Sequence, residues 1–231
     1  MKAMILAAGL GNRMRPLTLH TPKPLLEVGG KPLIVWHIEK LRALGICEIV
    51  INTAWLAEKL VETLGDGSAF GVKILWSHEQ EGLETAGGII RALPLLGEEP
   101  FILINGDVWT NFDFAPLLHV DLQDHLAYLM LVDNPAHNPQ GDFILSHQKA
   151  YCFEQNQTGQ ALTFSGISLL SPKLFANLAQ GKRPLAPLLR QAMQNQQVLA
   201  DYLPAAWVDV GTPERLKSLD LEIQQGVYCV H

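Results

Sequence analysis

The sequence predicts an α/β fold: a Rossmann-like, open, mixed sheet that is mostly parallel and carries helices on both faces. Through about residue 110, short apolar runs alternate with segments of helical periodicity, which is typical of a parallel sheet. Beyond that point strand-like runs follow one another with little helix between them, which indicates antiparallel additions. Because no linker or repeat interrupts the 231 residues, we expect one domain over residues 1–231.

The first half alternates strands with helices. The apolar run at 4–7 ends in glycines, as a buried parallel strand does where it enters a loop. One helical segment begins at Pro32 and stops at Gly45, and a second stops at Gly65. We expect strands at 4–7, 48–52, 72–76 and 101–104, and helices at 32–44, 56–64 and 86–93.

The second half is richer in strands. Strand-like runs occupy 127–132, 143–146 and 162–170. The segments 185–194 and 213–224 have the spacing of amphipathic helices, and we expect both to pack back on the first half. In an open sheet of this type, ligands bind at the carboxyl ends of the strands.

Charge is distributed unevenly along the chain. The formal net charge is −6, but residues 1–31 carry +4 and the remaining 200 residues carry −10. A small cationic region in an acidic protein suits a polyphosphate ligand, whereas a nucleic-acid groove needs a longer basic stripe. We therefore expect no nucleic-acid partner.

The cellular compartment is predicted from two expected absences, a membrane-spanning segment and a signal peptide. No apolar run approaches the roughly 18 residues that span a bilayer, so we expect no membrane partner. The first apolar stretch is interrupted by Gly9 and Gly11 before it could form a signal-peptide core, which predicts a cytoplasmic protein. Cys47, Cys152 and Cys229 lack the spacing of a disulfide framework or a zinc site, so we expect them to be reduced.

The strongest motif is a glycine-rich, basic run at 6–18, LAAGLGNRMRPLT, followed by Pro-Lys-Pro at 22–24. Glycines directly after a buried strand let backbone N–H groups approach phosphates, and the two arginines and the lysine supply positive charge. A dinucleotide fingerprint would need glycine where Met14 stands, and a P-loop would need Gly-Lys-Ser/Thr in place of the Gly-Lys-Pro at 30–32. The run therefore predicts a phosphate cradle of another type.

The run from 6 to 24 resembles the signature of the sugar-1-phosphate nucleotidyltransferases. Asn-Gly-Asp at 105–107 and Trp-Val-Asp-Val-Gly-Thr at 207–212 resemble the two acidic motifs of that family, and the resemblance extends along nearly the entire chain. It implies the nucleotide-diphospho-sugar transferase type of fold, with a nucleotide-binding half at about 1–110 and a sugar-phosphate-binding half at about 111–231. It also implies an enzyme that transfers a nucleotidyl group from a nucleoside triphosphate to a sugar 1-phosphate and releases pyrophosphate.

The resemblance further implies the catalytic groups. Asp107 and Asp209 would hold a Mg²⁺ cofactor between them, Arg15 would grip the leaving pyrophosphate, and Lys23 would contact the phosphates. Mg²⁺ binds one or two carboxylates together with phosphate oxygens, so two aspartates suffice. A sugar 1-phosphate is already largely dianionic near neutral pH and can attack without a general base. The expected catalytic residues are Arg15, Lys23 and Asp107, and the expected metal ligands are Asp107 and Asp209.

The segment 82–88 matches the Gly-Thr-Ala-Gly-like stretch with which members of this family bind the base. Glu84 stands where many relatives have glycine. Thr85 fits two roles equally well, a contact to the base and the N-cap of the following helix. The expected nucleotide-binding residues are Ala8, Gly9, Gly11, Asn12, Arg13, Lys23, Glu79, Thr85, Ala86 and Gly87.

The acceptor is expected to bind in the second half, where a polar stretch before Asp142 could close over the sugar. We expect His137 and His147 to be solvated loop residues rather than ligands. Many relatives have Glu-Lys-Pro where this chain has Glu-Gln-Asn at 154–156, so the lysine that would grip the sugar phosphate is absent and another group must replace it. The expected acceptor-binding residues are Asn105, Asp142, Glu154, Ser165 and Gly166.

The residues alone do not decide which nucleoside triphosphate is the donor. Within the family, the loops most resemble the uridylyltransferases, which implies UTP as the donor. A guanylyltransferase specificity is an alternative, because the glycine-rich run and Asn-Gly-Asp do not separate the two. A non-catalytic nucleotide-sugar sensor is a third, which the joint retention of Arg15, Lys23, Asp107 and Asp209 disfavours. We expect either a monomer or a homodimer.

Overall fold

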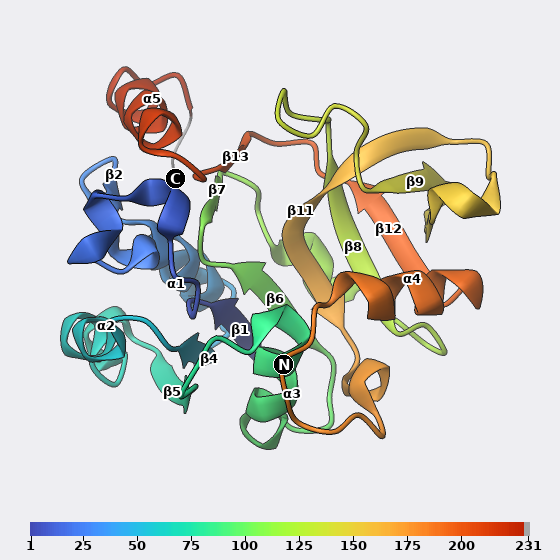
Figure 1. The fold of residues 1–231 in the computed structure, drawn as a ribbon, viewed down its shortest axis with the longest axis horizontal. Coiled ribbons are helices and arrows are strands. Elements are labelled where there is room, and N and C mark those ends of the chain that lie inside the picture. The colour runs from blue at the N-terminus through green and yellow to red at the C-terminus, as the bar shows by residue number, and fades with distance from the viewer. Residues whose placement is uncertain (229–231) are drawn as a thin grey trace.

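The computed structural model describes residues 1–228, and its main feature is a nine-stranded mixed sheet (Figure 1). The strand order is β5-β4-β1-β6-β11-β8-β12-β10-β9, and every strand except β11 and β10 points the same way. This confirms the mixed, mostly parallel sheet. Its strands are β1 (Ala3–Leu6), β4 (Glu48–Thr53), β5 (Lys73–His78), β6 (Phe101–Asn105), β8 (Ala127–Val132), β9 (Phe143–Ser146), β10 (Lys149–Tyr151), β11 (Gln160–Leu170) and β12 (Val198–Tyr202).

Helices cover both faces of the sheet because the buried strands alternate apolar side chains between the two sides. Ile5 of β1 faces a core that includes residues of α1 (Leu33–Ala43) and α2 (Ala57–Leu64). The next side chain back along the strand, Met4, belongs to a second core that includes residues of α3 (Glu84–Leu96) and α4 (Ala186–Gln194). The predicted helices on both faces are therefore confirmed.

The second half departs from one expectation. The helix α5 (Pro213–Gln224) packs on the first half, where its Leu219 and Ile223 join Val28 and Trp36 in a small third core. The expectation that α4 does the same is wrong: α4 lies against β10 and β12 (Figure 1). The connections explain this, because α4 joins β11 to β12 and must cover the part of the sheet that those strands occupy.

Two short two-stranded sheets complete the fold. One pairs β2 (Glu27–Val28) with β3 (Lys31–Pro32), and the other pairs β7 (Val108–Thr110) with β13 (Trp207–Asp209). Within residues 1–228 no helix has both the length and the apolar character to cross a bilayer. Cys47 and Cys152 are free thiols, and burial raises the pKa of Cys152, whereas Cys229 lies outside the described residues.

Helix α1 holds the short strand β7 from behind. The His37 ring contacts Val108 O through Nε2 at 2.9 Å, and Lys40 Nζ donates to Thr110 O at 2.5 Å and Phe112 O at 3.1 Å. His37 is fully buried, and this desolvation lowers its pKa from 6.5 to about 4. The neutral imidazole is therefore part of the folded structure near neutral pH.

This burial predicts a pH-dependent loss of stability. The unfolded chain binds a proton at His37 with a pKa of 6.5 and the folded chain only at about 4, so stability is fully present above pH 6.5 and falls toward pH 4. The loss attributable to His37 is on the order of 3 kcal/mol. Urea unfolding of wild type and His37→Gln between pH 7 and pH 4 measures it. The variant should show a shallower slope, and identical slopes would contradict the assignment.

Candidate active site

The candidate site lies at the carboxyl ends of β1, β4 and β6, where an open parallel sheet binds its ligands. A cleft of about 370 Å³ opens there. The glycine-rich loop from Ala7 to Leu10 forms one wall and the segment 82–85 another, while Lys23, Asn105 and Asp107 also line it. Loops that are distant in sequence thus converge on one cleft.

A buried polar chain joins the two walls. Ala7 N donates to Asn52 Oδ1 at 2.8 Å, and Asn52 Nδ2 donates to Glu79 Oε1 at 2.7 Å. The other Glu79 oxygen accepts from Leu83 N at 2.9 Å. Both polar side chains are buried, so each of these bonds satisfies a group that water does not reach. These hydrogen bonds set the spacing between the start of the glycine-rich loop and the start of α3.

Lys23 and Asp107 form an ion pair in the lining of the cleft. Lys23 Nζ donates to Asp107 Oδ2 at 2.7 Å, and Lys23 is 8% exposed. Asp107 follows β6 through a tight turn in which Gly106 N donates to Leu6 O at 2.9 Å. A Cβ at Gly106 would come 2.6 Å from that same oxygen, so the Asn-Gly-Asp turn requires its glycine.

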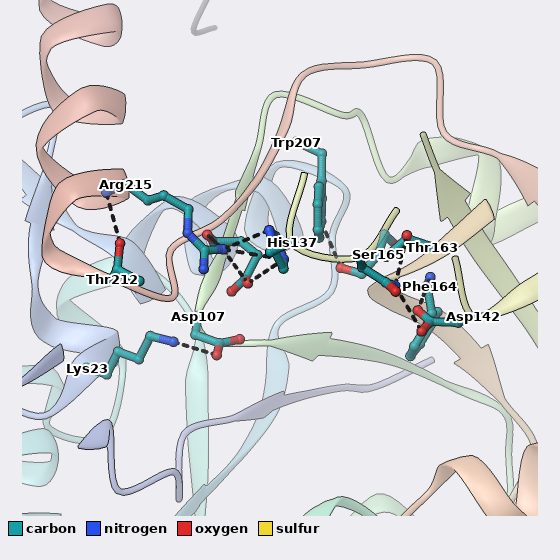
Figure 2. A network of polar contacts seen from close by, with 12 residues as sticks. Lys23, Asp107, His137, Asp142, Thr163, Phe164, Ser165, Trp207, Thr212 and Arg215 are labelled. Carbon is teal, nitrogen blue, oxygen red and sulfur yellow. Dashed lines mark hydrogen bonds and ion pairs between the residues drawn. The ribbon is translucent and has the colours of Figure 1, made fainter. Parts of the chain in front are cut away.

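The second aspartate comes from the far end of the chain. In the antiparallel pair of β7 and β13, Asp209 lies opposite Val108, and Val210 N donates to Asp107 O at 2.9 Å. Arg215 of α5 donates to Asp209 Oδ2 at 2.7 Å, and His137 Nε2 lies 3.3 Å from the same oxygen. Figure 2 shows Lys23 directed at Asp107, with His137 and Arg215 close to each other nearby. His137 and His147 are exposed loop residues, as expected, and His137 in addition contacts Asp209.

These carboxylates fit a magnesium ion that is shared with a substrate. Within residues 1–228 no group of three or more His, Cys, Asp or Glu side chains is arranged to hold a metal. Two aspartates on hydrogen-bonded neighbouring segments provide the one or two carboxylates that Mg²⁺ takes from a protein when phosphate oxygens supply further ligands.

A second cavity of about 480 Å³ adjoins the first and shares Glu84, Thr85 and Asn105 with it. Asp142 lines this cavity, and its carboxylate accepts from Asn138 Nδ2 at 3.0 Å and from Phe164 N at 2.8 Å (Figure 2). The polar stretch before Asp142 is therefore tied to β11 in this structure.

The structure brings five of the ten expected nucleotide-binding residues together in the cleft. Ala8, Gly9, Lys23, Glu79 and Thr85 line the cleft. The more distal part of the glycine-rich loop does not line it, and Ala86 and Gly87 are buried in the first turn of α3. Four expected residues lie on that distal part: Gly11, which is half-buried, and Asn12, Arg13 and Arg15, which are exposed.

The start of α3 differs from the expected cap. The helix begins at Glu84 after Leu83, without a side-chain cap, so the interpretation of Thr85 as an N-cap is wrong. Glu84 has φ +60°, a left-handed conformation that favours glycine, which explains why glycine suits this position in relatives. Gly87 N and Leu83 O bond the backbone of Arg183, so the second half contacts this wall directly.

The expected acceptor residues separate into three groups. Asn105 and Asp142 line the second cavity. Ser165 is buried and donates to Met130 O at 2.7 Å, and Gly166 packs against Asn105, so both support the cavity from behind. Glu154 is exposed and lines neither cavity.

Gln155 stands where many relatives have lysine, and it is engaged within the protein: its side chain accepts from Cys152 N at 2.8 Å and donates to Met193 O at 3.2 Å. The sequence analysis did not single out Asn52, Arg190 or Arg215 as site residues, and it named His137 without its contact to Asp209. Of these residues, only Arg215 could have been found from the sequence, because it lies three positions after Thr212, the N-cap of α5, which follows the second acidic motif.

Comparison with known proteins gives the family. Residues 2–143 match the family model described as nucleotidyl transferase. The chain is 52% identical over 222 residues to the N-acetylmuramate alpha-1-phosphate uridylyltransferase of Neisseria meningitidis, covering 94% of this chain and 96% of that protein. The chain belongs to the nucleotidyl transferase family.

The mannose-1-phosphate guanyltransferases that match this chain at lower identity are longer proteins. The chain is 32% identical to a mannose-1-phosphate guanyltransferase of Schizosaccharomyces pombe and spans 62% of its length. A structure assigned as a glucose-1-phosphate thymidylyltransferase of Bacillus anthracis superposes with a TM-score of 0.84 at 23% identity, covering 96% of this chain and 94% of that one. The structure of HddC of Yersinia pseudotuberculosis superposes with a TM-score of 0.79 at 23% identity, covering 96% of this chain and 99% of that one. These two structures confirm the fold.

Removing the amide that joins the two walls should weaken both stability and nucleotide binding. Asn52→Ala leaves Ala7 N and the Glu79 carboxylate without their buried partner. We expect a loss of about 1–3 kcal/mol in the free energy of unfolding and a raised KM for the nucleoside triphosphate. Urea denaturation and steady-state kinetics measure the two effects. An unchanged free energy of unfolding and an unchanged KM would show that the hydrogen bonds of Asn52 do not set the spacing of the two walls.

Gly166 offers a test of the border between the two cavities. It has φ +77°, and a Cβ there would come 2.6 Å from Asn105 Nδ2, so Gly166→Ala must displace Asn105. We expect a higher KM for the acceptor and, because Asn105 also lines the nucleotide cleft, a smaller rise in the KM for the triphosphate. Gly45→Ala is the matched control, because Gly45 has φ +78° and open space around its Cβ position. Equal effects of both variants on the acceptor KM would contradict this interpretation.

Proposed function

We propose that this chain transfers the uridylyl group of UTP to N-acetylmuramate α-1-phosphate, giving UDP-N-acetylmuramate and pyrophosphate. The observation that carries the proposal is the 52% identity to the meningococcal uridylyltransferase over 96% of that protein's length. The guanyltransferase of fission yeast matches at 32% over 62% of its length, which favours the uridylyl donor.

In this proposal the two cavities divide the substrates within one domain. The triphosphate would lie in the cleft between the glycine-rich loop and the segment 82–85, on the half formed by about residues 1–110. The sugar phosphate would lie in the adjoining cavity, on the half formed by about residues 111–231, with Asn105 at the border between them. A phosphate bound at the shared border would lie beside the nucleotide.

The reaction exchanges one phosphorus–oxygen bond for another. An oxygen of the acceptor phosphate bonds to the α-phosphorus of UTP while the bond from that phosphorus to the β-phosphate oxygen breaks, and pyrophosphate leaves. The acceptor is already ionised near neutral pH, so the chain need not remove a proton. Its task is to align the reacting groups and to neutralise charge.

Named side chains would perform that task. Lys23, held in place by Asp107, is positioned to contact the phosphates, and Arg15 would reach the leaving pyrophosphate from the exposed part of the loop. Asp107 and Asp209 would hold Mg²⁺, which when bound supplies positive charge to the phosphate oxygens. Arg215 would keep the Asp209 carboxylate in position.

The proposed product is a nucleotide-activated cell-wall sugar. We therefore infer a role in peptidoglycan recycling in the cytoplasm, where N-acetylmuramate released from old wall material would be returned to synthesis.

Pyrophosphate release tests the proposal directly. Purified protein with Mg²⁺ and N-acetylmuramate 1-phosphate is supplied separately with UTP, GTP, CTP and dTTP. We expect release with UTP, and a loss of at least about 100-fold in Asp107→Ala, because one of two metal ligands and the partner of Lys23 are removed. Asp124→Ala is the control, since Asp124 is exposed and makes no ion pair with the described residues.

Other outcomes would change the assignment. Release with GTP and mannose 1-phosphate, but not with UTP, would favour the guanylyltransferase alternative. Nucleotide binding without pyrophosphate release from any pairing would contradict catalysis and favour a nucleotide-sugar sensor.

A further inference from the structure

The second cavity is lined by one cationic side chain that has no ion-pair partner among residues 1–228. Of the described residues that line it, Arg190 of α4 is the only lysine or arginine. The two acids of the lining are already engaged: both oxygens of Asp142 accept hydrogen bonds, and Glu84 pairs with Lys182 at 3.7 Å. The Arg190 guanidinium makes no hydrogen bond or ion pair with any residue of 1–228 and is left for a ligand.

The surroundings of Arg190 favour an anionic ligand. Arg190 is itself exposed, and Phe143, Phe164, Leu185 and Leu189 line the same cavity and offer apolar contact to a bound group. A guanidinium presents a planar set of donors that matches the two oxygens of a carboxylate. The cavity thus has the features of a site for a carboxylate carried on a partly apolar body.

The position of Arg190 shows which anion of the acceptor it would meet. Asn105, Thr85 and Glu84 line both cavities, so the reacting phosphate belongs at that shared border. Arg190 lines only the second cavity, away from the cleft that holds Asp107. The acceptor of the proposed reaction carries a second anionic group, the carboxylate of the lactyl ether on its sugar ring.

We propose that Arg190 binds this lactyl carboxylate and thereby selects N-acetylmuramate 1-phosphate over N-acetylglucosamine 1-phosphate, which lacks the lactyl group. The inference rests on the proposed function and adds a specificity-determining residue to it. It also explains how the cavity can recognise this acceptor although Gln155 replaces the lysine of relatives and is bonded to Met193.

The test compares both acceptors at saturating UTP in wild type, Arg190→Gln and Arg190→Lys. A hydrogen-bonded charge pair corresponds to a factor of about 10 to 100 in binding. We expect Arg190→Gln to lower kcat/KM for N-acetylmuramate 1-phosphate by about that factor, mainly through KM, and to change the value for N-acetylglucosamine 1-phosphate less than about twofold. Arg190→Lys should restore part of the loss. Lys217→Gln is the control, because Lys217 is exposed on α5 and lines neither cavity.

Each other outcome has a distinct meaning. Equal losses for both acceptors would show that Arg190 contacts the phosphate, and no loss for either would show that it contacts neither; both results overturn the inference. Lack of wild-type turnover with UTP and either acceptor would instead overturn the proposed function. Calorimetric titration with the two acceptors would then decide the inference: a wild-type preference that Arg190→Gln abolishes supports it, and equal binding by both proteins overturns it.

Discussion

The pairing of β7 with β13 is the interaction on which the site depends, because it joins Asp107 to the strand that ends at Asp209. Several bonds fix this small ladder. His37 and Lys40 of α1 hold β7 from behind, and Thr110 Oγ1 donates to Ala206 O at 2.6 Å on the other side. The last helix takes part as well, since its Arg215 bonds Asp209. Residues from the middle and from the last part of the sequence thus form one acidic site.

The charges around this ladder are balanced in pairs. Lys23 neutralises Asp107, and Arg215 neutralises Asp209, so the four side chains sum to zero. A buried lysine without its aspartate would be strongly unfavourable, which explains why the pair is kept within hydrogen-bond distance. In the proposed reaction a metal ion and a polyphosphate, which bring opposite charges, would enter such a balanced site together at smaller electrostatic cost than either alone.

Regular elements could be predicted from the sequence, whereas the contacts that build the site could not. The strands β8 and β9 and the helix α5 have the predicted bounds, because apolar periodicity is a local signal. The strands β7 and β13 have only three residues each and show no period. Tertiary contacts decide which strands α4 covers, why Ser165 is buried and why His137 lies close to Asp209. The left-handed Glu84 contradicts residue preference and could not be read locally. The resemblance identified both aspartates but not the side chains that position them.

We propose that Asp107 and Asp209 together hold one divalent ion with the nucleotide. Calorimetric titration of Mn²⁺, used in place of Mg²⁺, into protein saturated with an unreactive α,β-methylene analogue of UTP tests it most directly. We predict one bound Mn²⁺ per chain in the wild type and greatly weakened binding in both Asp107→Asn and Asp209→Asn. Wild-type affinity in Asp209→Asn would contradict the account, because the β7 and β13 pairing would then bring together residues that do not share the metal.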